Sequence, residues 1–160
     1  MIRRGLLAVV VVLVACSRRE PPPAAAPAAP AVTLERTPCF GTCPVYTVAI
    51  LRDGKVEFDG KHHVADSGQA TATIPPERVD SLLAELEAVG YFGFADGYVM
   101  DSPACGMYAT DSPTVITSAT RDGETKTVRH DRGCSAPPPE LSQLEQRIDE
   151  VAGTGRWVRR

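Results

Sequence analysis

The chain has 160 residues, of which 43% are hydrophobic and 23% are charged, and its formal net charge at pH 7 is −3. This length fits one ordinary domain. A mildly acidic chain lacks the surplus of Lys and Arg that attracts nucleic acid, so the charge balance argues against a nucleic-acid-binding protein.

Residues 1–16 contain the three parts of a secretory signal. Two arginines are followed by an apolar run, Leu6–Ala15, that ends at Cys16. A basic start, a short apolar stretch and a small-residue cleavage site are typical of exported proteins. The cysteine at the cleavage point indicates a bacterial lipoprotein signal, so we expect residues 1–15 to be removed and Cys16 to carry acyl chains such as palmitate.

A membrane-spanning helix and plain secretion are the alternatives to a lipoprotein signal. The apolar run has half of the about 20 residues that a span requires, and Ser17-Arg18-Arg19 follows it directly. We therefore expect a lipid-anchored protein of the bacterial cell envelope. Ser17 after the cysteine favours the outer membrane, facing the periplasm; in a Gram-positive cell the anchor would lie in the outer face of the plasma membrane.

Residues 16–31 comprise the lipidated cysteine and a Pro/Ala-rich tether. Glu20–Ala31 reads EPPPAAAPAAPA. Proline at this density favours a semi-rigid, polyproline-like spacer without an apolar face. At about 3.1 Å per residue, the tether would hold the remaining chain about 45 Å from the bilayer. Residues 32–160 are then expected to form a single globular domain.

Two hairpins are predicted by β-rich runs on either side of an Arg-Asp-Gly tripeptide. The first tripeptide is Arg52-Asp53-Gly54, and the second, 69 residues later, is Arg121-Asp122-Gly123. Asp-Gly between such runs favours a hairpin because glycine accepts the positive φ of a tight turn. The predicted strands are Val45–Leu51 with Lys55–Asp59, Thr114–Thr120 with Glu124–His130, and a further strand at Gln69–Ile74.

A helix is predicted after each hairpin, from Pro76 to Gly90 and from Pro139 to Gly153. Apolar residues recur at a helical period in both: Val79, Leu82, Leu83, Leu86 and Val89 in the first, and Leu141, Leu144, Ile148 and Val151 in the second. Four of these positions correspond at a constant offset. The chain is therefore either a duplicated hairpin-helix unit or a chance likeness of two short amphipathic helices.

Together these elements predict an α+β fold, with an antiparallel sheet of about five to six strands and two helices packed on one face. Two loosely joined subdomains are the alternative. We expect the aromatic segment Tyr91-Phe92-Gly93-Phe94 to close the open end of the core. Trp157, among the arginines near the C-terminus, is expected to pack on the core.

Four cysteines remain after Cys16: Cys39, Cys43, Cys105 and Cys134. An even number in an exported domain predicts disulfides. We favour Cys39–Cys43 with Cys105–Cys134, because Gly41 and Pro44 allow a sharp turn and the second bridge would stabilise by about 3 kcal/mol in the chain-entropy model. The crossed pairing stays open. Zinc binding and thiol–disulfide exchange at Cys39/Cys43 are weaker alternatives, because the other two cysteines are isolated and redox motifs favour a two-residue gap.

The histidines His62, His63 and His130 are interpreted as polar residues of edge strands. Neighbours on a strand point to opposite faces, so His62 and His63 are not expected to share a metal. No hydrolase turn, phosphate loop or calcium loop is present in the sequence. We expect no catalytic residue, metal or cofactor.

The sequence thus favours a binding module over an enzyme, with thiol–disulfide or metal-dependent activity at Cys39/Cys43 as the alternative. The expected partners are the membrane, through the lipid anchor, and an envelope protein or the cell wall; no nucleic acid is expected.

One motif carries a resemblance to a known family. Residues 37–46 read Thr-Pro-Cys-Phe-Gly-Thr-Cys-Pro-Val-Tyr, an Asp-Gly hairpin follows, and the C-terminal part contains Ile148-Asp149 and Gly155-Arg-Trp-Val158. In these features the chain resembles an uncharacterised bacterial domain family often found in lipoproteins, with the motif Thr-Pro-Cys-Phe-Gly-x-Cys-Pro-x-Tyr. The likeness covers about Leu34 to Val158. It implies an envelope domain of unknown function and supplies no activity, substrate or catalytic residue.

Overall fold

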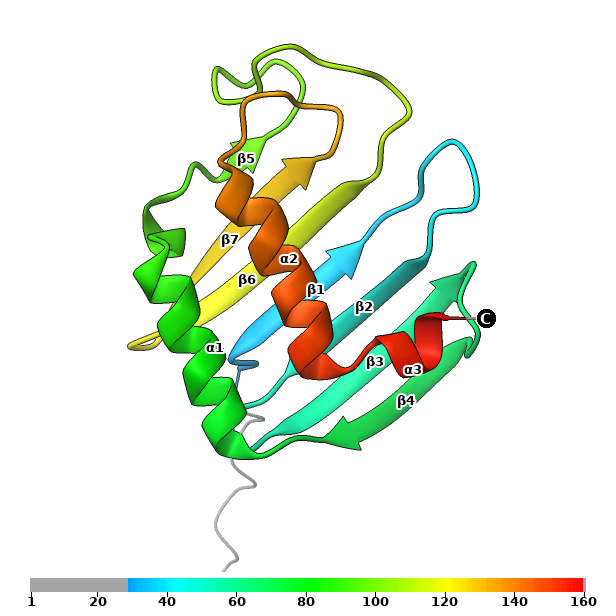
Figure 1. Ribbon diagram of the computed structural model, residues 1–160, viewed down its shortest axis with the longest axis vertical. Helices are drawn as coiled ribbons and strands as arrows, with labels where there is room; N and C mark the ends of the chain where they lie inside the picture. Colours follow the sequence, from blue (N-terminus) through cyan, green and yellow to red (C-terminus); the bar gives the residue numbers. More distant parts are fainter. Residues whose placement is uncertain (1–28, 160) are drawn as a thin grey trace, which may run out of the picture.

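Seven strands form one sheet in the order β4-β3-β2-β1-β6-β7-β5 in the structure, a computed structural model that describes residues 29–159 (Figure 1). Neighbouring strands are antiparallel, except that β5 runs parallel to β7. The strands are β1 (Val32–Arg36), β2 (Val45–Ile50), β3 (Lys55–His62), β4 (Gly68–Thr73), β5 (Gly97–Tyr98), β6 (Thr114–Arg121) and β7 (Glu124–Asp131).

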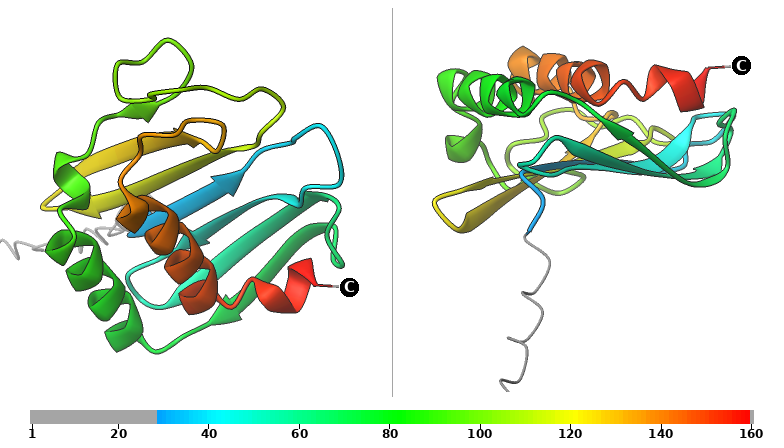
Figure 2. Two further views of the ribbon diagram at one scale, coloured as in Figure 1. Left: turned by 45° about the horizontal axis from the view of Figure 1, so that its top comes forward. Right: turned by 90° about the horizontal axis from the view of Figure 1, so that it is seen from below.

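The two long helices cover the same face of this sheet, and no helix of residues 29–159 lies on the opposite face (Figure 2). They are α1 (Pro76–Ala88) and α2 (Pro139–Ala152), accompanied by the 3₁₀ turn η1 (Tyr91–Gly93) and the short α3 (Gly155–Val158). The α+β class and the packing of two helices on one face are therefore as predicted. Among the helices of residues 29–159, none is both long and apolar enough to cross a bilayer.

The strand number is higher than the predicted five to six. The sequence did not identify β1 or β5 as strands. β1 has only five residues and follows a proline-rich segment, and β5 has only two, which leaves too few positions for an alternation of apolar and polar residues to be recognised. The difference matters, because β1 is the central strand that joins the two hairpins.

The two Asp-Gly hairpins have different turns. The first closes at Leu51 and Lys55 with three residues between them, and its Gly54 has φ +86°. The second pairs Arg121 with Glu124, so only two residues form its turn, both with positive φ. The shared tripeptide thus builds a glycine-bulge loop once and a tight two-residue turn once.

The core lies between the sheet and the helices. Alternate residues of β1 point into it, with Val32 and Leu34 buried and Glu35 exposed. The helices bury the predicted apolar stripes, except that Leu83 is only partly buried and Val89, just beyond the end of α1, is exposed. Tyr91 is buried, and its aromatic neighbours pack against the core as expected.

The predicted signal segment 1–15, the lipidation site Cys16 and most of the tether lie outside the described residues. The last tether residue, Ala31, is already buried. Its N–H donates to the Ile50 carbonyl of β2, and its carbonyl accepts from Thr120 of β6. The folded body therefore includes Ala31, one residue before β1.

Candidate functional site

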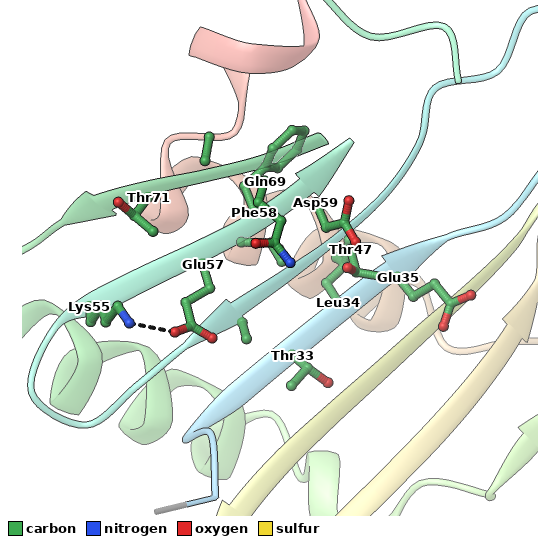
Figure 3. A pocket seen from close by; sticks show the side chains of 13 residues that line it. Thr33, Leu34, Glu35, Thr47, Lys55, Glu57, Phe58, Asp59, Gln69 and Thr71 are labelled. Atoms are coloured by element: carbon green, nitrogen blue, oxygen red, sulfur yellow. Dashed lines mark hydrogen bonds and ion pairs between the residues drawn. The ribbon is translucent and has the colours of Figure 1, made fainter. Parts of the chain in front are cut away.

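A hollow of about 540 Å³ lies in the sheet face that the helices leave uncovered (Figure 3). We call it the open-face hollow. Because successive side chains of a strand alternate between faces, it is lined by the outward-pointing residues of β1 to β4. Those residues are Thr33, Glu35, Thr47, Ala49, Lys55, Glu57, Asp59, Gln69 and Thr71.

Strand register arranges these side chains in two rows that cross the strands. One row consists of Glu35, Thr47, Asp59 and Gln69, and the other of Thr33, Ala49, Glu57 and Thr71. The lining side chains of β2, Thr47 and Ala49, are short, whereas β1 and β3 contribute longer ones such as Glu35, Lys55 and Glu57. In Figure 3, Glu35 and Asp59 lie on either side of Thr47.

Two of the three carboxylates of the open-face hollow are paired with a lysine. Glu57 accepts a 2.6 Å bond from Lys55, whose pKa is raised by this hydrogen bond and by the charge of Glu57. Asp59 accepts a bond of the same length from Lys61. Glu35 forms no ion pair with any residue of the described range, so it is the carboxylate that remains open to a ligand cation.

Chemically, the open-face hollow offers hydroxyl, amide and carboxylate groups to a ligand. Its volume lies within the range of about 300–1,000 Å³ that is typical of ligand sites. Its lining contains no histidine and no cysteine. Such a lining has the hydrogen-bonding groups and the one uncompensated negative charge with which a polar ligand could be recognised.

The four predicted disulfide cysteines lie away from the open-face hollow. The structure bonds Cys39 to Cys43 and Cys105 to Cys134, the pairing that the sequence favoured. Cys39–Cys43 closes the loop between β1 and β2, in which Phe40 is 89% exposed. A backbone hydrogen bond from Phe40 to Asp111 joins this loop to the loop before β6. In the described residues, no group of three or more His, Cys, Asp or Glu side chains could hold a metal ion.

The predicted surface position is wrong for His130. His62 and His63 are exposed, but His130 is buried beneath α2 on the helix-covered face. Its Nδ1 lies 2.5 Å from an oxygen of the buried Glu145, whose second oxygen accepts a 3.0 Å bond from Arg132. Burial of a carboxylate requires such partners, so this cluster satisfies Glu145 where α2 packs on β7.

The two parts of the recognised motif meet in a second polar cluster. Asp149 of α2 accepts bonds of 3.0 and 2.6 Å from Arg36, 2.7 Å from the Tyr46 hydroxyl and 2.8 Å from the Thr154 hydroxyl. Burial and the charge of Asp149 raise the pKa of Tyr46, which holds its phenol neutral. The four residues tie β1, β2, α2 and the C-terminal turn together.

An aromatic stack continues from this cluster. Phe58 lies between Tyr46 and Trp157, with ring centroids 5.4 and 4.8 Å apart. The Trp157 carbonyl accepts backbone bonds from Ala65 and Asp66. The motif residues Tyr46, Asp149 and Trp157 therefore have a structural role in joining the C-terminus to the sheet.

The sequence of this chain matches a known protein family. A family described as "Domain of unknown function (DUF6438)" matches residues 30–152. The chain belongs to this family. The matched part of the DUF6438 domain starts just before β1 and ends with α2, so it includes the whole sheet and both long helices. No curated protein matches the chain.

The sequence did not identify the residues of the open-face hollow in this DUF6438 domain. Their types are common on any exposed strand face, and the central strand that places Thr33 and Glu35 beside β2 was not predicted. The available signals were the alternations in β2 and β3, which assign Thr47, Glu57 and Asp59, among others, to the face opposite the core.

Proposed function

We propose that this chain is a lipid-anchored protein of the bacterial cell envelope whose DUF6438 domain is a binding module for cell-wall peptidoglycan. The observation that carries the proposal is the open-face hollow, with its hydroxyl, amide and carboxylate lining on an uncovered sheet face. Peptidoglycan presents sugar hydroxyls, amides and free amino groups, which complement that lining.

The charge of the hollow favours the amino groups of the wall peptides as a main contact. Glu35 has no cation partner among residues 29–159, and it stands at the rim beside Thr47. An ammonium group placed there would form a charge-assisted hydrogen bond, which is about twice as strong as a neutral one.

The N-terminal segment supports the location. A signal that ends at Cys16 would place the domain outside the cytoplasm, and a proline-rich tether would hold it away from the lipid surface. β1 begins at the end of the sheet opposite the disulfide-closed loops (Figure 1). The uncovered face then remains accessible to a polymer beside the membrane.

Co-sedimentation of the full chain in detergent with purified peptidoglycan tests this function. We expect wild-type protein to pellet with the wall, and Thr47→Leu, which would fill the floor of the hollow, to reduce the bound fraction several-fold. Thr127→Leu is the matched control, because Thr127 is equally exposed on the same face but lies on β7, outside the hollow.

A second matched pair isolates the charge. Glu35→Gln should weaken binding several-fold, whereas Glu124→Gln, at the distant hairpin tip, should not change it. If wild-type protein stays in the supernatant at all wall concentrations, or if the controls bind as weakly as the hollow variants, peptidoglycan is not the ligand of this face.

A further inference from the structure

Strand β4 forms one edge of the sheet, and its outer side pairs with no other strand of the described chain (Figure 1). An edge strand presents unpaired N–H and C=O groups that can bind another strand. The position of hydrogen bonds between β3 and β4 shows which residues of β4 present them.

The β3–β4 ladder determines which backbone N–H and C=O groups of β4 point away from β3, towards the free edge. The N–H of Ile74 donates to the Gly54 carbonyl, so Gly54 and Ile74 form a hydrogen-bonded pair. In an antiparallel ladder such pairs recur at every second residue, so Ala72 and Ala70 direct their backbone groups towards β3. The backbone N–H and C=O groups of the alternate residues, Gln69, Thr71 and Thr73, therefore point away from the sheet.

The β2–β3 ladder agrees with this assignment. The N–H of Leu51 donates to the Lys55 carbonyl, so residues 55, 57 and 59 use their backbone groups towards β2. The intervening residues of β3 are left for β4, as the first ladder requires.

Nothing in β4 protects it from pairing. Its sequence, Gly-Gln-Ala-Thr-Ala-Thr, has no charge and no proline, and its ladder with β3 has no bulge. Proteins usually protect edges with charged residues, bulges or covering segments. The opposite edge is protected in this way: β5 covers part of β7, and Lys126 and Arg129 lie on β7.

We propose that a second copy of this chain binds this edge, so that the β4 strands of two copies pair antiparallel about a two-fold axis through Thr71. In this register Thr71 of one copy lies opposite Thr71 of the other. Gln69 of each copy lies opposite Thr73 of the other, and Ala70 lies opposite Ala72. All three outward-pointing residues of each strand then face outward-pointing residues of the other, which forms about six inter-strand hydrogen bonds.

The side chains of β4, like its backbone groups, are compatible with the proposed register. Directly opposed residues of an antiparallel pair lie on the same face, and here amide and hydroxyl side chains meet on the open face while alanines meet on the helix-covered face. Two-fold symmetry places no like charges against each other, because β4 has none. The self-complementary pattern is the reason for choosing a second copy as the occupant.

Pairing would also enlarge the binding face. Gln69 and Thr71 line the open-face hollow (Figure 3), and each would lie beside residues of the second copy's β4. The hollows of the two copies would lie on one continuous sheet face. The pairing itself needs no ligand, so its test is separate from the test of peptidoglycan binding.

Cysteine cross-linking of the full chain in detergent tests the register. In the proposed pair the Thr71 Cα atoms lie about 5.5 Å apart, within the range of a disulfide. Thr71→Cys should therefore give a covalent dimer under mild oxidation. The matched control is Thr73→Cys, because its copies would be about 13 Å apart along the strands and should stay monomeric. Combining Gln69→Cys with Thr73→Cys should restore the cross-link.

Sedimentation velocity gives the second arm and does not depend on introduced thiols. Wild-type chain should show a dimer fraction that rises with concentration. Thr71→Pro removes an N–H that the register uses between copies and that β3 does not use, so it should shift the chain to monomer while the fold remains intact. Thr127→Lys on the opposite edge should leave the dimer fraction unchanged.

Two results would overturn the proposal. One is a wild-type chain that stays monomeric over the full concentration range. The other is cross-linking of Thr73→Cys as efficient as that of Thr71→Cys, which would indicate random contacts within micelles and not the two-fold register.

Discussion

Replacing Asp149 with asparagine should destabilise the domain strongly, although the change removes no atom from the core. The carboxylate accepts four hydrogen bonds, two from Arg36 and one each from the Tyr46 and Thr154 hydroxyls. Asparagine keeps one acceptor oxygen, but its NH₂ group would face donors. Arg36 would also lose its charge partner while remaining largely buried.

The magnitude follows from burial. Breaking a fully buried ion pair by changing one partner costs about 3–5 kcal/mol, because an uncompensated charge remains. The side chains of Arg36 and Asp149 are 23% and 17% exposed, so water offsets part of this cost. We expect Asp149→Asn to lower the free energy of unfolding by about 2–3 kcal/mol.

The chain contains a matched control for geometry. Arg147 also binds a carboxylate with two nitrogens, at 2.8 and 3.0 Å from the oxygens of Glu85, but these side chains are 39% and 41% exposed. Exposed ion pairs contribute about 0.2–1 kcal/mol. Glu85→Gln should therefore cost less than about 1 kcal/mol.

Urea denaturation of both variants measures the difference in their free energies of unfolding, when the curves are fitted to a two-state model with one shared m-value. A buried, stabilising role for Asp149 is excluded if Glu85→Gln costs as much as Asp149→Asn, or if Asp149→Asn changes the unfolding free energy by less than about 0.5 kcal/mol.

Three further predictions concern the turns, the disulfides and alkaline pH. In thermal melts, Gly54→Ala should lower the melting temperature much more than Gly123→Ala. An added Cβ would lie 2.0 Å from the Ile74 carbonyl oxygen at position 54, whereas it would meet nothing within 4 Å at position 123. Equal losses would contradict this explanation. Replacing Cys105 and Cys134 with serine should lower the free energy of unfolding by about 3–4 kcal/mol, and replacing Cys39 and Cys43 should lower it by about 2 kcal/mol, because the first disulfide closes the longer loop. The reverse order, or a reactive Cys39 thiol in the native protein, would count against a structural role for both disulfides. Burial raises the pKa of Tyr91 to about 12, so the folded state retains a proton that the unfolded state loses, and stability should fall as pH rises above about 10. Tyr91→Phe should reduce this alkaline loss, as measured by urea denaturation across the pH range; an unchanged loss would refute the assignment.

Much of the fold could be predicted because its signals are local. The Asp-Gly turns and the apolar stripes of the two helices depend on residues within one or two turns of each other. They were sufficient for the α+β class and for helices on one face. The near repeat of hairpin and helix could also be recognised in the sequence. That the same tripeptide forms two different turns could not be predicted.

The central strand could not be predicted because its environment is not local. Val32–Arg36 pairs with β2 on one side and with β6, about 80 residues later, on the other. Five residues with only two buried apolar side chains give little alternation. The same strand carries Glu35, so a missed strand became a missed site residue.

The buried polar residues were missed for a related reason. His130 and Glu145 lie 15 residues apart on different elements, and a glutamate taken alone is typical of a surface. Only the packing of α2 on β7 brings them within 2.5 Å. The motif with Tyr46 and Asp149 was recognised as a sequence pattern. That these residues connect the sheet to α2 became clear only from the fold.

Mapping of amide chemical shifts with soluble peptidoglycan fragments shows whether the uncovered face of the sheet binds the cell wall. We expect the fragments to shift the amide resonances of Glu35, Thr47 and Glu57 and to leave those of Thr125 and Thr127 unchanged. Shifts confined to the disulfide-closed loop around Phe40, or no shifts at all, would contradict it.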